Sequence, residues 1–198
     1  MVRNYLGSVR QWHWISSALC LAALLLFAIT GFTLNHAASI EATPKVTEHI
    51  VEMPQALLEQ LQQSEPEVPA NVDQWIRDEL NVSIAGSGAE WSPHDFYLSM
   101  PRPGGDAWLS IDFANGEVLY EVTSRGWISY FNDLHKGRHT GAAWSLFIDL
   151  TALACVIFAI TGLVLLQRHS SKRPSTWPLT SLGLLAPILL LLLFSHNG

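Results

Sequence analysis

Histidine is the residue whose placement in this sequence is most informative about chemistry. The chain holds eight histidines, and five of them stand within a few residues of an end of a long apolar segment. Imidazole nitrogens bind iron, copper and zinc, and an imidazole changes charge near neutral pH. The five candidate ligands are His13, His36, His135, His139 and His169.

The spacing of these histidines predicts two groups. His13 and His36 are 23 residues apart, which is about 35 Å along a straight helix. That length slightly exceeds the hydrocarbon thickness of a bilayer, about 30 Å. His139 and His169 bracket a second apolar segment in the same way. Antiparallel helices would bring His36 near His135 and His139 at one membrane face, and His13 near His169 at the other.

Two imidazoles on facing helices are the axial ligands that a six-coordinate b-type haem needs. The pattern therefore predicts one or two haems, with the haem iron held by the same histidines, and electron transfer across the membrane. Each histidine could instead be structural, because amphipathic rings favour the membrane–water interface. A porphyrin-free zinc or iron site at His135 and His139 is disfavoured, since Gly137 interrupts their helical spacing.

The sequence Phe-Ala-Ile-Thr-Gly occurs twice, at residues 27–31 and 158–162. The two copies lie near opposite ends of the two apolar segments, which indicates inverted pseudo-symmetry. Thr-Gly lets a backbone or a flat macrocycle approach closely, although small residues are also common at ordinary membrane helix contacts. We expect four of these residues to pack beside the histidines: Thr30, Gly31, Thr161 and Gly162.

Asp149 is the only ionisable side chain, apart from two thiols, within the predicted hydrocarbon region. A carboxylate in the membrane is costly, so it warrants a functional hypothesis. Asp149 could orient His36 through the second ring nitrogen. The alternative is a hydrogen bond to Ser16, Thr30 or another hydroxyl that only fixes the pairing of helices.

Three apolar segments, residues 14–34, 142–166 and 177–194, have the length and composition of membrane-spanning helices. The first is predicted to be an uncleaved anchor, because residues 35–38 offer no clear signal-peptidase site. Basic residues before the first segment and between the second and third predict that both stretches face the cytoplasm. These residues are Arg3, Arg10, Arg168, Lys172 and Arg173.

Residues 37–140 hold sixteen of the seventeen carboxylates and are predicted to be translocated. Arg125, Lys136 and Arg138 lie against the positive-inside rule near the second segment, so they are candidates for binding something anionic. Within this region we predict an extended linker at 41–53, a helix from Pro54, and a second helix over 72–80 with Asn71 as its N-cap. A strand at 95–100 and a hairpin around Asn115-Gly116 follow.

No nucleophile–base arrangement, phosphate loop or paired carboxylates appear in this region, and nothing indicates nucleic-acid binding. The two cysteines lie inside predicted membrane segments, so the translocated domain has no disulfide. A helix pair with a small antiparallel sheet is typical of a binding or packing module. Any redox chemistry therefore belongs to the histidines at the membrane.

Several motifs together resemble the PepSY-associated transmembrane family. They are Arg10-Gln-Trp-His13-Trp, Phe27-Ala-Ile-Thr-Gly-Phe-Thr-Leu-Asn-His36, Leu134-His135-Lys-Gly-Arg138 and Phe158-Ala-Ile-Thr-Gly162. The resemblance implies an α-helical protein of the bacterial inner (cytoplasmic) membrane. Three transmembrane helices would carry a small α+β PepSY-like periplasmic domain inserted between the first two.

The resemblance also implies a function, because the family includes haem-containing reductases that pass electrons to ferric siderophores. The chain would be a ferric-siderophore reductase or its electron-transfer subunit. It lacks flavin and nicotinamide motifs, so a quinol or another reductase would donate the electrons. It also has three predicted spans where the larger reductases usually have four or more. The alternative is a non-catalytic accessory subunit that binds a membrane-protein partner or a peptide through its periplasmic domain.

The predicted boundaries follow from these assignments. Residues 1–12 are cytoplasmic, 13–36 form the first membrane helix, and 37–140 form the periplasmic domain with its linkers. Residues 141–167 form the second membrane helix, 168–175 a cytoplasmic loop, 176–195 the third helix and 196–198 a periplasmic C-terminus.

Overall fold

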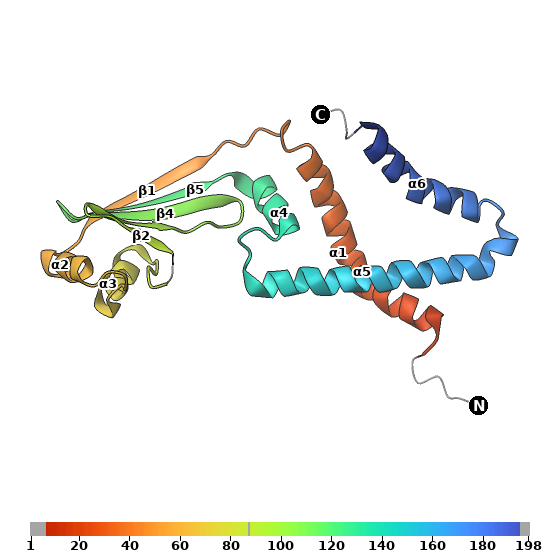
Figure 1. The fold of residues 1–198 in the computed structure, drawn as a ribbon, viewed down its shortest axis with the longest axis horizontal. Coiled ribbons are helices and arrows are strands. Elements are labelled where there is room, and N and C mark those ends of the chain that lie inside the picture. Colours follow the sequence, from red (N-terminus) through yellow and green to blue (C-terminus); the bar gives the residue numbers. More distant parts are fainter. Residues whose placement is uncertain (1–6, 87, 195–198) are drawn as a thin grey trace. The chain divides into compact units, whose positions relative to one another are not determined.

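A computed structural model describes residues 7–86 and 88–194. The predicted cytoplasmic residues 1–6 and the predicted periplasmic residues 196–198 lie outside the described residues. The chain divides into two compact units, which are described separately below (Figure 1). One unit contains residues 1–26 and 147–198, and the other contains residues 27–146.

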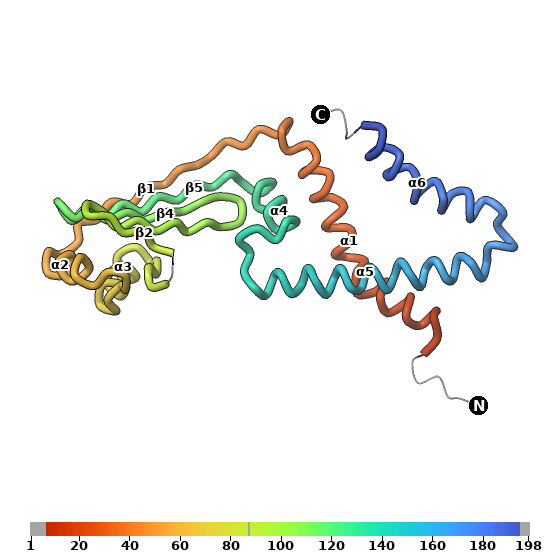
Figure 2. Tube along the Cα trace, viewed as in Figure 1, coloured from red at the N-terminus to blue at the C-terminus, as the bar shows by residue number. Residues whose placement is uncertain are grey.

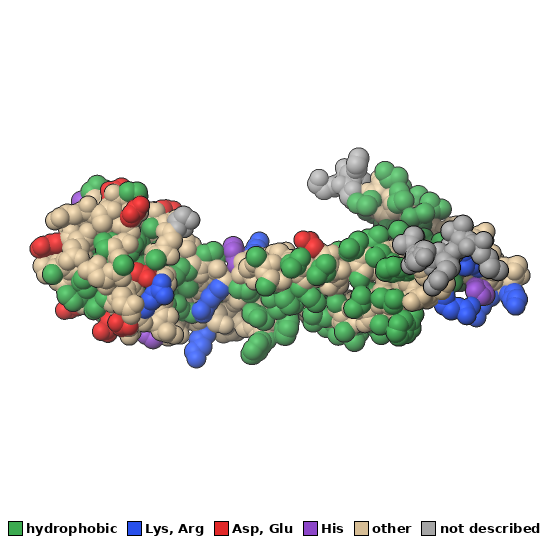
Figure 3. Space-filling view, turned by 90° about the horizontal axis from the view of Figure 1, so that it is seen from below, with side chains coloured by type: hydrophobic (Ala, Val, Ile, Leu, Met, Phe, Trp, Pro, Cys, Tyr) green, Lys and Arg blue, Asp and Glu red, His purple; other side chains and the backbone are tan. Residues whose placement is uncertain are grey.

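Three helices are long and apolar enough to cross a membrane: α1 (Val9–Asn35), α5 (Gly141–His169) and α6 (Thr176–Phe194). A 3-10 turn, Ser170–Lys172, follows α5. Nearly all leucines of α6 are exposed, as expected for a helix whose surroundings are lipid. Apolar side chains likewise cover the helical part of the face shown in Figure 3, whereas Asp and Glu gather on the sheet-containing part. The chain is therefore a multi-pass membrane protein.

Between the first two membrane helices lies a five-stranded antiparallel sheet with the order β1-β5-β4-β3-β2. The strands are β1 (Lys45–Glu52), β2 (Ala89–Trp91), β3 (Asp95–Ser99), β4 (Gly105–Asp112) and β5 (Glu117–Ser124). Strands β4 and β5 form the predicted hairpin, whose turn is closed by Gly116 in a left-handed conformation (φ 77°).

Two amphipathic helices, α2 (Gln55–Gln63) and α3 (Ala70–Leu80), cover one face of this sheet (Figures 1 and 2). The core between the layers consists of leucine, isoleucine and valine from the helices and alternate residues of the strands. Its fully buried members include Leu58, Leu61, Val72, Ile76, Phe96, Leu109, Ile111 and Val118. The predicted α+β domain between the first and second membrane helices is confirmed; we call residues 45–124 the sheet domain.

Two local predictions are wrong. The predicted linker at 41–53 contains β1, which pairs with β5 from Lys45↔Ser124 to Glu52↔Glu117. Seven of the eight β1 residues are exposed, so the edge strand lacks the apolar alternation that identifies strands in a sequence. Asn71 is not an N-cap, since α3 begins at Ala70 after Pro69. The Asn71 amide instead donates to Gln60 Oε1 at 2.5 Å.

Asp73, in the first turn of α3, anchors the loop that follows this helix. Its carboxylate is 6% exposed and accepts hydrogen bonds from the Ile84 and Ala85 amides (2.7 and 2.9 Å), from Ser83 and from Arg77. Burial alone would raise the pKa of Asp73, but these hydrogen bonds outweigh it and lower the pKa below its ordinary value.

Candidate functional site

Helix α4 (Gly126–Lys136), which the sequence analysis did not predict, carries His135. The helix ends at Gly137, which is its C-cap and adopts a left-handed conformation (φ 66°). His139 is also left-handed (φ 56°). His135 and His139 are therefore not on one helix, which agrees with the argument against a zinc site between them. Within residues 7–86 and 88–194, no group of three or more His, Cys, Asp or Glu side chains could hold a metal ion.

His135 packs against the first Phe-Ala-Ile-Thr-Gly copy. The Thr30 hydroxyl lies 2.7 Å from His135 Nδ1, and it donates to the Phe27 carbonyl at 3.3 Å. The Thr30 hydroxyl therefore engages Nδ1 of His135, and Nε2 is the ring nitrogen on the other side of the imidazole. A Cβ on Gly31 would lie 3.5 Å from His135 Cε1, and the Phe27 ring meets the imidazole edge-on at 5.2 Å. We call these four residues the His135 cradle.

His13 packs against the second copy in the same way. Its Nδ1 lies 3.1 Å from Thr161 Oγ1 and 3.3 Å from the Phe158 carbonyl. The Thr161 hydroxyl donates to the Ile157 carbonyl at 2.7 Å, and the Phe158 carbonyl can only accept, so Nδ1 of His13 is the donor and Nε2 is free to bind a metal. A Cβ on Gly162 would lie 3.3 Å from His13 Cε1, and Phe158 stacks on the ring at 4.7 Å. We call this group the His13 cradle.

Both copies of the repeat thus hold a histidine from another helix through the same three residue types. The contacts place Thr30, Gly31, Thr161 and Gly162 beside histidines, as the sequence predicts. The glycines let the imidazole approach the helix backbone, and the threonine hydroxyls engage Nδ1 of each histidine. Whether these histidines bind haem stays a prediction.

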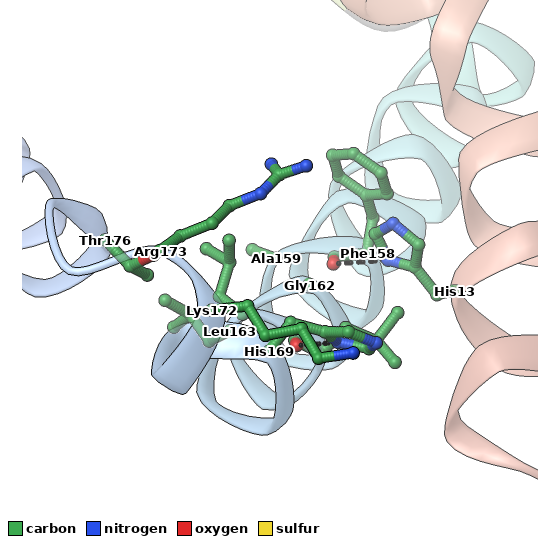
Figure 4. A pocket seen from close by; sticks show the side chains of 11 residues that line it. His13, Phe158, Ala159, Gly162, Leu163, His169, Lys172, Arg173 and Thr176 are labelled. Carbon is green, nitrogen blue, oxygen red and sulfur yellow. Dashed lines mark hydrogen bonds between the residues drawn. The ribbon is translucent and has the colours of Figure 1, made fainter.

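A pocket of about 780 Å³ opens beside the His13 cradle (Figure 4). His169 lines it together with His13, so this predicted pair shares one cavity. The Nδ1 atom of His169 donates to the Leu165 carbonyl at 2.8 Å; a carbonyl only accepts, so Nε2 keeps its lone pair. The walls are mainly apolar, and Arg173 extends across the pocket toward the side formed by Phe158. The remaining lining residues are Ala159, Gly162, Leu163, Leu165, Leu166, Lys172 and Thr176.

The other predicted group is only partly assembled. His36 is exposed and donates Nδ1–H to the Phe32 carbonyl at 2.9 Å, on its own helix. Among the described residues, no hydrogen bond or ring contact joins His36 to His135 or His139. His139 lines a separate polar pocket of about 390 Å³ that includes Leu34 near the end of α1.

The orienting role of Asp149 toward His36 stays a prediction; within its own helix, Nδ1 of His36 donates to the Phe32 carbonyl. Ser16, an alternative partner of Asp149, donates to the carbonyls of Trp12 and His13. Asp149 itself is exposed, and it makes no hydrogen bond within the part of the chain that the structure describes.

Helix α4 is held by its polar side. Asn132 accepts a hydrogen bond from the Thr33 hydroxyl of α1 at 2.8 Å, and Asp133 accepts one from the Gly104 amide at 2.8 Å. Gly104 is left-handed (φ 73°), and a Cβ there would lie 2.7 Å from Tyr130 Cα. The turn at 101–106 therefore positions the helix that carries His135.

These positions lie inside a match to a known family. A model of the PepSY_TM-like family matches residues 4–196, which include all three membrane helices, the sheet domain and both cradles. The chain belongs to the PepSY_TM-like family. No curated protein and no solved structure matches the chain significantly. The family suspected from the motifs is thus confirmed, and the function of this PepSY_TM-like protein has to be argued from its own residues.

Proposed function

We propose that this PepSY_TM-like protein binds b-type haem and transfers electrons across the bacterial inner membrane to ferric siderophore iron. The observation that carries the proposal is the pair His13 and His169. Both line one pocket, and both have Nδ1 engaged so that Nε2 is free to bind iron. Metal-binding histidines commonly donate the second ring N–H in this way, because the bond fixes the ring and raises its basicity.

The residues of this pocket fit a haem in three respects. Its volume of about 780 Å³ lies in the range of small-molecule and cofactor sites. Leu163, Leu166 and Phe158 supply an apolar wall for a macrocycle. Lys172 and Arg173 supply cations for the propionate carboxylates, and an Arg guanidinium can bind a carboxylate through two hydrogen bonds.

Each of these side chains has a definite task. Thr161 and the Phe158 carbonyl keep the His13 ring in one orientation and one tautomer, and the Leu165 carbonyl does so for His169. The leucines exclude water, which strengthens the attraction between Arg173 and a carboxylate. A bound haem would supply one-electron transfer, which none of these side chains can perform alone.

The same reasoning extends the proposal to the His135 cradle. Thr30 engages Nδ1 of His135 and the Phe32 carbonyl engages Nδ1 of His36, so Nε2 is the nitrogen of each ring that would bind iron. A second haem there would complete a route from a quinol or reductase donor to a periplasmic acceptor. Ferric iron binds hard oxygen ligands more tightly than ferrous iron does, so reduction would release the metal from its chelate.

The test is a reduced-minus-oxidised absorption spectrum with pyridine haemochrome quantification on protein purified from haem-replete cells. We expect a Soret band in the wild-type protein, and parallel loss of one haem in His13→Ala and in His169→Ala. His135→Ala and His36→Ala should remove a second, separable haem. His94→Ala, which changes an exposed histidine of the sheet domain, is the matched control and should leave the spectrum unchanged.

A wild-type protein without a Soret band, despite haem supply, would overturn the proposal. The accessory function would then be favoured, and one observation supports it. The sheet face opposite α2 and α3 carries Tyr97 and Trp108, whose rings lie 5.9 Å apart, and Trp108 donates to Glu121 at 3.1 Å. Loss of a co-purifying membrane partner in Trp108→Ala would identify that face as its binding surface.

A further inference from the structure

Helix α4 presents an apolar face that covers no core. Trp127 is 77% exposed, and Ile128, Tyr130 and Phe131 are 45%, 36% and 39% exposed. At 100° per residue these side chains lie on one side of the helix. The aromatic rings contact one another at centroid distances of 5.6–6.4 Å. We call these four residues the aromatic face of α4.

The opposite side of α4 is already occupied within its own unit. Asn132 and Asp133 are buried there and bind Thr33 and Gly104, as described above. The aromatic face is therefore largely exposed, and only the Tyr130 side of it adjoins the sheet domain, at Gly104. The polar side of α4 is hydrogen-bonded to its own unit, whereas its aromatic side chains are exposed. Such an exposed apolar face is expected to be covered by an apolar environment.

The start of α5 indicates what this neighbour is. Helix α5 begins at Gly141, a few residues after the end of α4, and Trp144 in its first turn donates to the Leu134 carbonyl at 2.9 Å. The last turn of α4 is thereby fixed at the level where α5 enters the membrane. Lys136 and Arg138 at this junction are exposed, and no described carboxylate pairs with either.

We propose that α4 lies in the phospholipid interface as a membrane-surface helix, with its aromatic face in the upper acyl region. Tryptophan and tyrosine favour this boundary, and an amphipathic helix with a basic end binds it through apolar burial and attraction to lipid phosphates. Lys136 and Arg138 supply that attraction, which also explains basic residues on a side where the positive-inside rule disfavours them. The lipid surface would thus help to position His135, whether or not haem is bound.

The test is site-directed spin labelling of the full chain in phospholipid nanodiscs that contain phosphatidylglycerol. Cys20 and Cys155 are first replaced by serine, and a nitroxide is attached at Trp127→Cys. Collision rates with oxygen, which concentrates in lipid, and with a water-soluble nickel chelate are then compared. Two further positions calibrate the scale: Leu146→Cys on the exposed surface of α5 and Glu79→Cys on α3.

We expect oxygen to exceed the nickel chelate at residues 127 and 146, and the reverse at residue 79. A nickel-accessible residue 127 would overturn the proposal, because the face would then be in water. Low access to both reagents would also overturn it, because a second copy or another protein would then cover the face. Lipid exchange from phosphatidylglycerol to phosphatidylcholine should lower oxygen access at 127 but not at 146. If the labelled Trp127→Cys variant fails to fold, a label at Phe131→Cys replaces it under the same criteria.

Discussion

The two histidine cradles use the same five-residue motif but differ in what surrounds them. In the His135 cradle the threonine is buried, the bond to Nδ1 is 2.7 Å, and the phenylalanine meets the ring edge-on. In the His13 cradle the bond to threonine is 3.1 Å, a carbonyl lies beside it at 3.3 Å, and the phenylalanine stacks on the ring. Only the His13 cradle adjoins the pocket of about 780 Å³ that contains a second histidine.

This difference teaches that the motif positions an imidazole, while the neighbouring elements decide what the imidazole can reach. His135 itself lies on α4, and the hydrogen bond from the Gly104 amide to Asp133 fixes this helix to the sheet domain. At His13 the neighbour is the basic end of α5, which leaves space for a ligand. Four substitutions test this comparison.

The largest effect is expected for Gly104→Ala. An alanine there adds left-handed strain of about 1–2 kcal/mol and overlaps the Tyr130 backbone, which costs about 1–3 kcal/mol more. Thermal unfolding in detergent should show the loss, together with weaker protection of α4 from proteolysis. Gly141→Ala is the matched control, since its φ is 78° but nothing lies near its Cβ. Equal stability of the two variants would contradict the view that this turn holds α4.

A smaller loss, about 2–3 kcal/mol at neutral pH, is expected for Asp73→Asn, because the hydrogen bonds to a charged acceptor are weakened. This substitution destabilises the sheet domain without touching either cradle. The folded pKa of Asp73 is lowered from 3.8. Its stabilisation is therefore complete above the unfolded pKa and is lost as the pH falls through the folded pKa.

The difference in unfolding free energy between wild type and Asp73→Asn should accordingly shrink below about pH 4. Chemical denaturation across pH 3–7 measures it. Asp78→Asn, on the exposed surface of the same helix, serves as the control and should show little loss. A constant difference across this pH range would show that the charge of Asp73 does not stabilise the fold.

The smallest effects are expected for Thr30→Val and Thr161→Val, which remove one hydroxyl from each cradle. Thr30→Val should cost about 1–2 kcal/mol, because it removes the hydrogen bond to Nδ1 of His135 at a buried position. Thr161→Val should cost about 0.5–1 kcal/mol, since the Phe158 carbonyl remains beside Nδ1 of His13. Thermal unfolding of both variants, with Thr180→Val as a control away from any histidine, tests this order. The reverse order would mean that the cradles are not distinguished by this second acceptor.

Much of this arrangement could be predicted from residue patterns. Long apolar segments identify membrane helices, Asn115-Gly116 identifies the hairpin, and the repeated motif indicates packing beside histidines. Helix α4 was missed because its apolar side chains point away from any core and Gly126 and Gly137 interrupt the pattern on either side. Strand β1 was missed because an exposed edge strand shows no alternation.

The site differs from its prediction for a related reason. Helical spacing alone could place His13 and His169 at one end of α5, because both belong to helices that the sequence identifies. The His135 cradle depends on α4, whose position is set by Gly104 and Asn132 across long sequence separations. The partner of His36 is a carbonyl of its own helix, and no pattern of side chains can reveal a backbone acceptor.

The pairing of β1 with β5 has a mechanical consequence. The chain enters the sheet domain at Lys45 and leaves it at Ser124, and these two residues are register partners at the same end of the two strands (Figure 2). Tension that pulls these two ends apart would load the hydrogen bonds one pair at a time, as in opening a zipper, instead of shearing all of them together. Strand β1, at the edge of the sheet, would peel away first and leave β5, β4 and β3 paired. A weak force at Lys45 and Ser124 would therefore separate β1 from the sheet while the core of the domain stayed folded.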